Sequence, residues 1–236
     1  MKVVRSFAHE LDLMTPTEGY TRTPGLHASE IYNALCKKLD PKRYDKRDPK
    51  TKLPLPMPED RVGFGTRFEE ALEPQLKTRY QGYRPGEFAV QHGEDCPRAY
   101  QSLAKKRPAN RNPVKPGDPL CPCGAGIIYS PDYLFFVDGH PPILGEFKLT
   151  WMSSKGFPDD PKFMKWLMQV KFYLRNLQMN DVWFFPFWVN GGTDNAYHSA
   201  QPEFKRAHHL RFSDGECEQT HQRLIRFARK EGMLAT

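Results

Sequence analysis

The chain of 236 residues is long enough to bury a real hydrophobic core, and its length is typical of one domain of generous size. Its 13% aromatic and 27% charged residues indicate a globular protein and exclude a disordered one. No apolar run is long enough to cross a bilayer, and the first residues lack the apolar core of a signal peptide, so we expect a soluble, cytoplasmic protein with no membrane partner.

The net charge of +7 is a mild basic excess, because 28 acidic residues offset most of the 35 basic ones. The basic residues concentrate in two segments, 37–52 and 98–115. One interpretation is that both segments are loops kept in solution by their charge. The other is that they follow the phosphate backbone of a nucleic acid.

The first 60 residues combine one helix with a linker rich in Pro and Lys. Ser29 is expected to cap the helix, whose buried face carries Ile31, Leu35 and Leu39. The linker, residues 39–60, contains too many prolines for a helix or an inner strand.

A second helix is predicted around residues 64–76, where Phe64, Phe68, Leu72 and Leu76 recur every four positions. A short strand is expected within residues 86–91. Residues 93–124, rich in Pro, Lys, Arg and Asn, are interpreted as a basic loop inserted into the domain.

The second half of the chain alternates strands and helices. Residues 127–138 and 141–151 are rich in β-branched and aromatic side chains, which predicts two strands paired as an antiparallel hairpin. An amphipathic helix is predicted over 161–178. Residues 181–190 are apolar on both faces, which indicates an inner strand with Pro186 at a bulge or an edge position.

A polar strand over 203–213 and a basic helix over 218–232 are predicted to end the chain. The resulting order is helix, three strands, helix, two strands and helix. This order predicts an α/β fold with mixed strand directions.

Three charged residues interrupt the apolar strands of the hairpin. Glu146 and Lys148 are two positions apart, so they share one face of a strand while Phe147 points to the other. An antiparallel partner could bring Asp132 beside them. Buried charges are unfavourable without a partner, and two carboxylates with a backbone carbonyl suit Mg²⁺. An ordinary structural ion pair remains the alternative, because a Glu-x-Lys pattern is short and common.

Four motifs in this order resemble those of the PD-(D/E)XK nuclease superfamily. Pro131-Asp132 followed by Glu146-Phe147-Lys148 matches the motif that names the superfamily. Gly65-x-x-x-Glu69 looks like the helical glutamate motif of its RecB-like and phage (lambda-type) exonuclease-like branch, and Gln169-x-x-x-Tyr173 is similar to a motif of the same branch. The resemblance covers about residues 63–190.

The resemblance implies a restriction-endonuclease-like core: a mixed central β-sheet flanked by helices in the order αβββαβ, within a single domain of residues 1–236. It also implies one or two Mg²⁺ or Mn²⁺ ions held by Asp132, Glu146, the carbonyl of Phe147 and Glu69, with Glu70 as the rival of Glu69. Lys148 would orient or help to deprotonate the attacking water. Gln169 and Tyr173 would contact DNA or brace the lysine.

The function implied is a metal-dependent DNA exonuclease that processes ends in recombination or repair, of the phage type. A structure-specific or restriction-type endonuclease, and a non-catalytic nucleic-acid-binding module on the same fold, are the alternatives. Double-stranded DNA ends are the expected substrate, with a recombinase or single-strand-binding protein as a further partner and a homo-oligomer as a further expectation. Contacts to the DNA backbone are assigned to Lys105, Lys106, Arg107, Arg111, Lys155, Lys162 and Lys165.

The cysteines allow a second type of site. His92 and Cys96 precede the basic loop, and Cys121 and Cys123 follow it, so the four side chains could hold a tetrahedral Zn²⁺. Buried, inert thiols are the alternative, because free cysteines are often buried. An iron–sulfur cluster of the RecB-like type is not expected, since that pattern needs three late cysteines and the chain has only Cys217.

Overall fold

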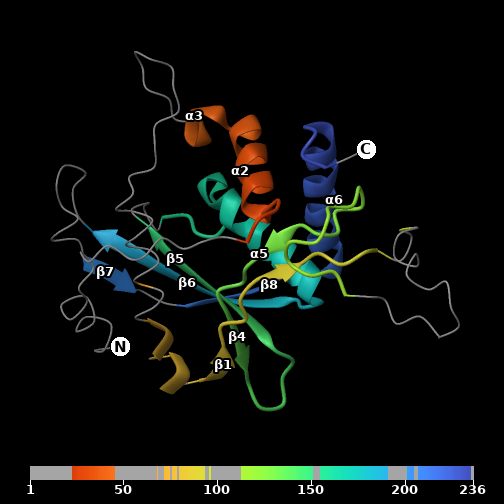
Figure 1. Ribbon diagram of the computed structural model, residues 1–236. Helices are drawn as coiled ribbons and strands as arrows, with labels where there is room; N and C mark the ends of the chain where they lie inside the picture. Colours follow the sequence, from red (N-terminus) through yellow and green to blue (C-terminus); the bar gives the residue numbers. More distant parts are fainter. Residues whose placement is uncertain are drawn as a thin grey trace, which may run out of the picture.

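A mixed β-sheet forms the centre of the protein, with helices packed against it (Figure 1). The computed structural model describes residues 23–45, 68, 72–74, 76–78, 80–93, 96, 113–150, 155–190, 201–204 and 207–234. The strands of the main sheet are β1 (Gln81–Tyr83), β4 (Tyr133–Phe136), β5 (Ile143–Thr150), β6 (Asp181–Asn190), β7 (Gln201–Phe204) and β8 (His208–Arg211). Among the described residues this sheet is six-stranded, in the order β1-β4-β5-β6-β7, and β8 also pairs with β6. The α/β class and the mixed sheet flanked by helices are therefore confirmed.

The predicted hairpin forms between β4 and β5, where Tyr133 lies opposite Gly145 and Phe135 lies opposite Ile143. A Cβ atom on Gly145 would lie 2.5 Å from a ring carbon of Phe135, so this position of β5 requires a glycine. The turn of the hairpin, residues 137–142, is mostly exposed.

The strands β5 and β6 run parallel, with Leu144 opposite Val182 and Thr150 opposite Trp188. A parallel pair needs a long crossover, which α5 (Met164–Leu177) supplies after the short 3-10 helix η2 (Pro161–Phe163). The helix predicted over 161–178 is thus confirmed, with its first turn in the tighter 3-10 form.

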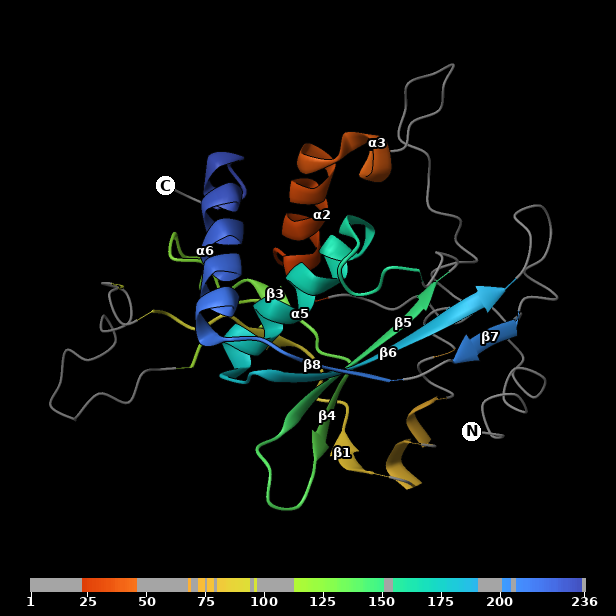
Figure 2. The ribbon, with the colours of Figure 1, turned by 180° about the vertical axis from the view of Figure 1, so that it is seen from behind.

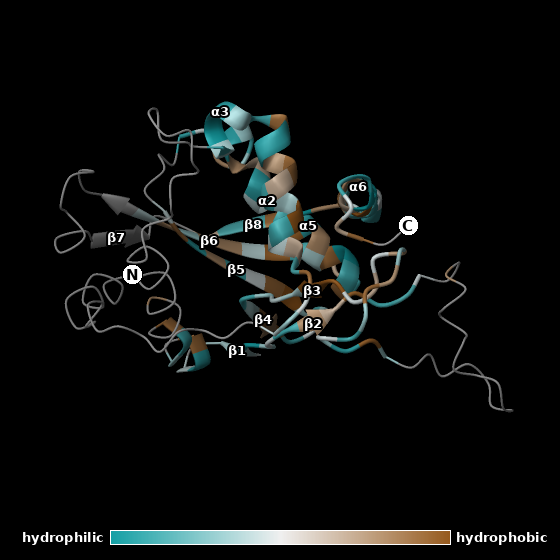
Figure 3. Ribbon diagram, turned by 45° about the horizontal axis from the view of Figure 1, so that its top comes forward, coloured by the Kyte–Doolittle hydropathy of each residue, from teal (hydrophilic) through white to brown (hydrophobic). Residues whose placement is uncertain are grey.

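One face of the sheet is covered by three helices: α2 (Ala28–Leu39), α5 and α6 (Asp214–Lys230), as Figures 1 and 2 show. The short helix α3 (Pro41–Tyr44) follows α2. The central helix, α5, packs against both α2 and α6. Apolar stretches of β5 and β6 lie beneath α5 in Figure 3. The larger hydrophobic core fills this layer.

The opposite face of the sheet has a smaller, aromatic core. It is built from Tyr133, Phe135, Ile143, Phe147, Phe185 and Phe187, together with Phe68 and Leu76. The described residues 68, 72–74 and 76–78 are helical, as the four-residue periodicity predicted.

Strand β6 contributes to both cores, which confirms the prediction of an inner strand. Val182 and Phe184 lie in the larger core, and Phe185 and Phe187 lie in the aromatic one. Pro186 is on neither a bulge nor an edge. On the side away from β5, β8 pairs with residues 181–184 and β7 with 187–190, so Pro186 lies in the gap between these two neighbours.

Two predicted strands are each divided in the structure. The strand predicted over 127–138 is broken at residues 130–132, where β3 (Ile128–Tyr129) ends before β4 begins. The first part pairs with β2 (Phe88–Ala89) in a separate two-stranded sheet. The strand predicted over 203–213 is divided into β7 and β8, and residues 205–206 between them lie outside the described residues.

The first residues of two helices, α2 and α6, differ from the prediction. Helix α2 is capped by His27 rather than by Ser29, because residues 26–28 enter it from a strand-like contact with Ile128. Leu39, predicted on its buried face, is 43% exposed at the last position of the helix. Helix α6 begins four residues earlier than predicted, at Asp214, because Ser213 and Glu216 form a capping box.

Much of the N-terminal segment and of the basic insertion lies outside the described residues. Residues 23–45 are described within the segment 1–60, and residues 93, 96 and 113–124 within the insertion 93–124. None of the described helices combines the length and the apolar character that crossing a bilayer requires.

Candidate functional site

The break between β3 and β4 places Asp132 beside the neighbouring strand. Pro131 ends the pairing of one strand before the next begins. The Oδ2 atom of Asp132 then accepts a hydrogen bond of 2.8 Å from the backbone N–H of Phe147 in β5. The aspartate predicted from the hairpin is therefore adjacent to the Glu-x-Lys segment.

The pleat of β5 separates its charged residues from its apolar one. Phe147 stacks on Phe185 in the aromatic core, with ring centroids 5.0 Å apart. Glu146 lies on the other face, fully buried, and its Oε1 atom contacts the ammonium of Lys148. The shared face predicted for Glu146 and Lys148 is confirmed.

Helix α5 adds the two polar residues of the predicted Gln-x-x-x-Tyr motif. The amide nitrogen of Gln169 donates a hydrogen bond of 2.7 Å to Glu146 Oε1 and lies 3.1 Å from the hydroxyl of Tyr173. Both side chains are buried, and they are one helical turn apart on the face that meets the sheet. Gln169 therefore fixes the orientation of the Glu146 carboxylate.

A fourth segment contributes a residue that the sequence did not indicate. Tyr32, in α2, is buried and hydrogen-bonded to Tyr173. Burial raises the pKa of its hydroxyl to about 12, and Lys148 and Glu146 are close enough to act on it with opposite signs. Ile31 and Leu35 were predicted to pack in the core, and in the sequence Tyr32 beside them looks like one more packing residue.

We call Asp132, Glu146, Lys148, Gln169 and Tyr173 the carboxylate centre. Burial raises the pKa of Asp132, and this effect outweighs the opposing influence of Lys148 and of the Phe147 N–H. Burial also acts to lower the pKa of Lys148, but Glu146 and Asp132 outweigh it, so that pKa lies above its ordinary value. The centre therefore favours a cationic lysine beside an aspartate that is poorly solvated as an anion.

Three of the predicted DNA-contacting residues are described. Lys155 is exposed, and its carbonyl accepts a hydrogen bond of 2.6 Å from the Lys162 ammonium, which also lies 3.6 Å from Asp160. Lys165 is half-buried, and burial followed by repulsion from Lys148 lowers its pKa. Lys165 thus belongs to the surroundings of the carboxylate centre.

The other predicted residues of these sites lie outside the described residues. They are Glu69, Glu70, Lys105, Lys106, Arg107 and Arg111.

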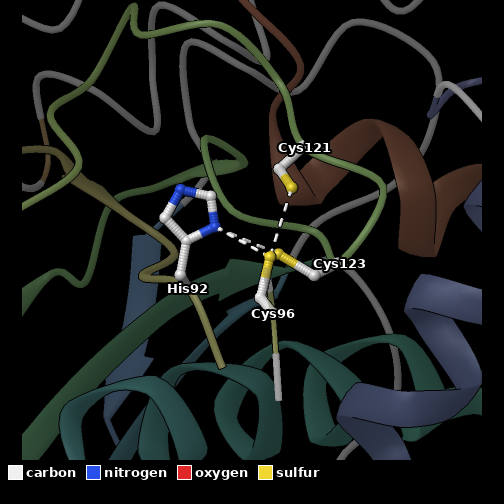
Figure 4. A group of neighbouring side chains, drawn as sticks. All are labelled: His92, Cys96, Cys121 and Cys123. Carbon is white, nitrogen blue, oxygen red and sulfur yellow. Dashed lines mark hydrogen bonds between the residues drawn. The ribbon is translucent and has the colours of Figure 1, made fainter. Parts of the chain in front are cut away.

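The four residues predicted to bind zinc lie together in the structure. His92, Cys96, Cys121 and Cys123 place one ligand atom each within 4.8 Å of all the others, so they form a group that could hold a metal ion (Figure 4). We call this group the His–Cys cluster. Its side chains come from both ends of the basic insertion.

The comparisons with known proteins leave the function open. No family model and no curated protein matches the chain. A solved structure described as "Crystal structure of SSO0001" is similar over 100% of this chain and 85% of that one, with 12% sequence identity and a TM-score of 0.45.

Proposed function

We propose that the protein is a metal-dependent DNA nuclease with a restriction-endonuclease-like core, and specifically an exonuclease that processes DNA ends. The observation that supports this proposal is the meeting of Asp132, Glu146 and Lys148 at one point of the sheet. The resemblance to PD-(D/E)XK nucleases assigns these same three residues to catalysis. Gln169 and Tyr173, which that resemblance also assigns to the site, contact the same carboxylate or each other.

The donor atoms of the carboxylate centre suit a hard divalent cation. Asp132 and Glu146 offer carboxylate oxygens, and the carbonyl of Phe147 adds a third oxygen donor. The raised pKa of Asp132 marks a carboxylate that a nearby cation would stabilise. We assign Glu69 as a further ligand on the resemblance alone. When bound, Mg²⁺ or Mn²⁺ lowers the pKa of a bound water and neutralises charge on the attacked phosphate.

The remaining residues of the centre orient these groups. Lys148 contacts Glu146 through its ammonium, and we assign it to orienting or helping to deprotonate the attacking water and to stabilising phosphate charge. Gln169 holds the Glu146 carboxylate in place through the 2.7 Å hydrogen bond. Tyr173 and Tyr32 close the centre on the side of the helices.

Cleavage assays on purified protein test the proposal. End-labelled linear DNA and closed circular DNA are incubated with Mg²⁺, Mn²⁺ or EDTA. Glu146→Gln and Lys148→Ala are compared with the wild type, and Lys77→Ala serves as the matched control, because Lys77 forms an exposed ion pair with Glu73 at 2.7 Å. We expect metal-dependent loss of linear DNA by the wild type and the control, and a decrease of at least about 100-fold in both site variants.

Three outcomes differ in meaning. Cleavage of the circular DNA, abolished in the same variants, would keep the metal site but favour the endonuclease. DNA binding without cleavage under either metal would leave only a binding module. Cleavage that survives in both site variants would place the active site elsewhere.

A further inference from the structure

The His–Cys cluster offers four soft or borderline ligands at the base of the basic insertion. His92 and Cys96 lie just after β2, and Cys121 and Cys123 lie just before β3. We propose that these four side chains bind one structural Zn²⁺, which fastens the two ends of the segment 97–120 to each other. This proposal does not depend on the proposed nuclease activity.

Three distances within the cluster match the edges of a tetrahedral zinc site. With bonds of about 2.3 Å to sulfur and about 2.0 Å to nitrogen, a tetrahedron has edges of roughly 3.8 Å between two sulfurs and roughly 3.5 Å between sulfur and nitrogen. The Sγ atoms of Cys96 and Cys121 are 3.7 Å apart. The Nδ1 atom of His92 lies 3.4 Å from the Sγ atoms of both Cys96 and Cys123.

These contacts favour a metal over the alternative of inert thiols. Cys96 and Cys121 form no disulfide, because their sulfurs are much farther apart than the roughly 2.05 Å of that bond. The single lone pair of a neutral His92 Nδ1 accepts well from only one thiol, whereas one cation would satisfy this nitrogen and both sulfurs at once, in a cluster otherwise lined by Ala125 and Val114. Thiolates and imidazole select Zn²⁺ rather than Mg²⁺, and four protein ligands leave no open position for a substrate. The site is therefore structural.

The backbone holds the second pair of ligands in place by itself. In the turn 121–125, the N–H of Gly124 donates to Cys121 O and the N–H of Cys121 donates to Ala125 O, both at 2.8 Å. Gly124 has a φ of +96°, and a Cβ atom there would lie 2.4 Å from Ile225 of α6. The carbonyl of Pro122 accepts a hydrogen bond of 2.5 Å from Arg229 of the same helix.

The first pair of ligands is joined to the same structure through the small sheet. The N–H of Val90 donates to Ile127 O at 2.9 Å, and the N–H of Gly126 donates to Val90 O at 3.0 Å. These two hydrogen bonds lie between the His92 segment and the Cys123 segment. Zinc would thus link two segments that the backbone already places side by side, and would fix where the insertion leaves and re-enters the domain.

Metal analysis of the full chain, purified under reducing conditions without added chelator, tests the site. We expect one Zn²⁺ per chain, and the visible absorption of tetrahedral cobalt–thiolate when Co²⁺ replaces zinc. Cys121→Ser and His92→Ala should lose the metal to a chelator that the wild type resists. Cys217→Ser is the matched control, because Cys217 is a buried thiol in α6, and it should keep the metal.

His92→Cys keeps the test valid if removal of a ligand prevents folding. A fourth thiolate completes the tetrahedron, so this variant should retain zinc and show the cobalt spectrum of a site with four sulfurs. A folded wild-type chain that takes up neither Zn²⁺ nor Co²⁺ would overturn the proposal. Zinc content unchanged in both Cys121→Ser and His92→Ala would overturn it as well. Neither the zinc content nor the cobalt spectrum depends on DNA cleavage.

Discussion

Asp132 occupies a position that is unfavourable for an ionised carboxylate in the absence of a cation. Burial raises its pKa above the ordinary value of 3.8, despite Lys148 and the N–H of Phe147. A group with a raised acid pKa binds more protons in the folded state, so its contribution to the free energy of unfolding falls as the pH rises from 3.8 to the raised value. At neutral pH, the buried Asp132 carboxylate therefore lowers the free energy of unfolding.

Replacing Asp132 with Asn should therefore stabilise the protein, and it should remove the proposed nuclease activity. The amide keeps an oxygen for the Phe147 N–H but carries no charge. In EDTA at pH 7, we expect the melting temperature of Asp132→Asn to exceed that of the wild type by about 2–4 °C. Mg²⁺ should raise the melting temperature of the wild type only, since it binds only the intact site.

Asp138→Asn is the control for this measurement, because Asp138 is exposed in the hairpin turn. A lower melting temperature for Asp132→Asn than for the wild type in EDTA would contradict the interpretation. In that case the electrostatic attraction of Lys148 would outweigh the burial of the carboxylate.

The residues of the carboxylate centre differ in how well the sequence foretells them. Glu146 and Lys148 are predictable, because charges at a spacing of two in an apolar strand share a face. Asp132 follows from the hairpin. Tyr32 cannot be predicted from the sequence. A tyrosine on the buried face of a helix fits the same apolar pattern whether it only packs or also forms a hydrogen bond in a site.

At the scale of elements, the interface between α5 and α6 contains a buried histidine, His221. His221 of α6 stacks on Phe172 of α5, with ring centroids 5.2 Å apart and planes at 18°. The side chain is buried, and neither ring nitrogen has a hydrogen-bond partner among the described residues. Burial, followed by the nearby Arg175, lowers its pKa to about 4, although Glu218 opposes this shift.

This histidine should make the helical layer sensitive to acid. A lowered pKa means that stability is complete above the ordinary value of 6.5 and is lost as the pH falls toward 4. Between pH 7 and pH 4.5, we expect His221 to account for a loss of about 2–3 kcal/mol in the free energy of unfolding. Denaturant unfolding of the wild type and of His221→Phe, which keeps the aromatic stack, measures this difference.

The variant is informative because other groups titrate in the same range. Subtracting the pH dependence of His221→Phe from that of the wild type removes their contribution. His140→Gln, in the exposed hairpin turn, should behave as the wild type does. An equal loss of stability in His221→Phe and the wild type would show that other groups cause the acid sensitivity.

Most elements follow from the sequence, and the exceptions have local causes. The four-residue periodicity of the helices and the apolar run of β6 are both set by burial, which the sequence pattern shows. The break at 130–132 is less visible, because the stretches 127–129 and 133–137 on either side of it are apolar and suit one long strand. Pro186 fits in an inner strand because it lies between the segment of β6 that pairs with β8 and the segment that pairs with β7. This arrangement depends on the tertiary structure.

At the scale of the whole molecule, the mild excess of positive charge is compatible with the proposed DNA partner and would give binding that does not depend on base sequence. Lys155 is exposed and described, so it allows a direct test of a phosphate contact. The test uses a Glu146→Gln background, in which we expect no cleavage. In that background, Lys155→Ala should weaken DNA binding and reduce the slope of the logarithm of the association constant against the logarithm of the salt concentration by about 1. Lys230→Ala, exposed at the end of α6, should leave that slope unchanged. Fluorescence anisotropy across a salt series gives both values, and equal slopes for the two variants would exclude a contact by Lys155.

The hairpin that carries the carboxylate centre also determines how relatives of this chain can be recognised. Asp132 and Glu146 are brought together by the pairing of Tyr133 with Gly145, whereas the 13 residues between them in sequence depend on the length of the turn at 137–142. Lengthening an exposed turn by two residues preserves the pairing and the side-chain alternation. A search with one fixed spacing would therefore miss homologues with the same geometry, whereas the two-residue step from Glu146 to Lys148 and the four-residue step from Gln169 to Tyr173 are set by the geometry of one strand and one helix and do not depend on the turn.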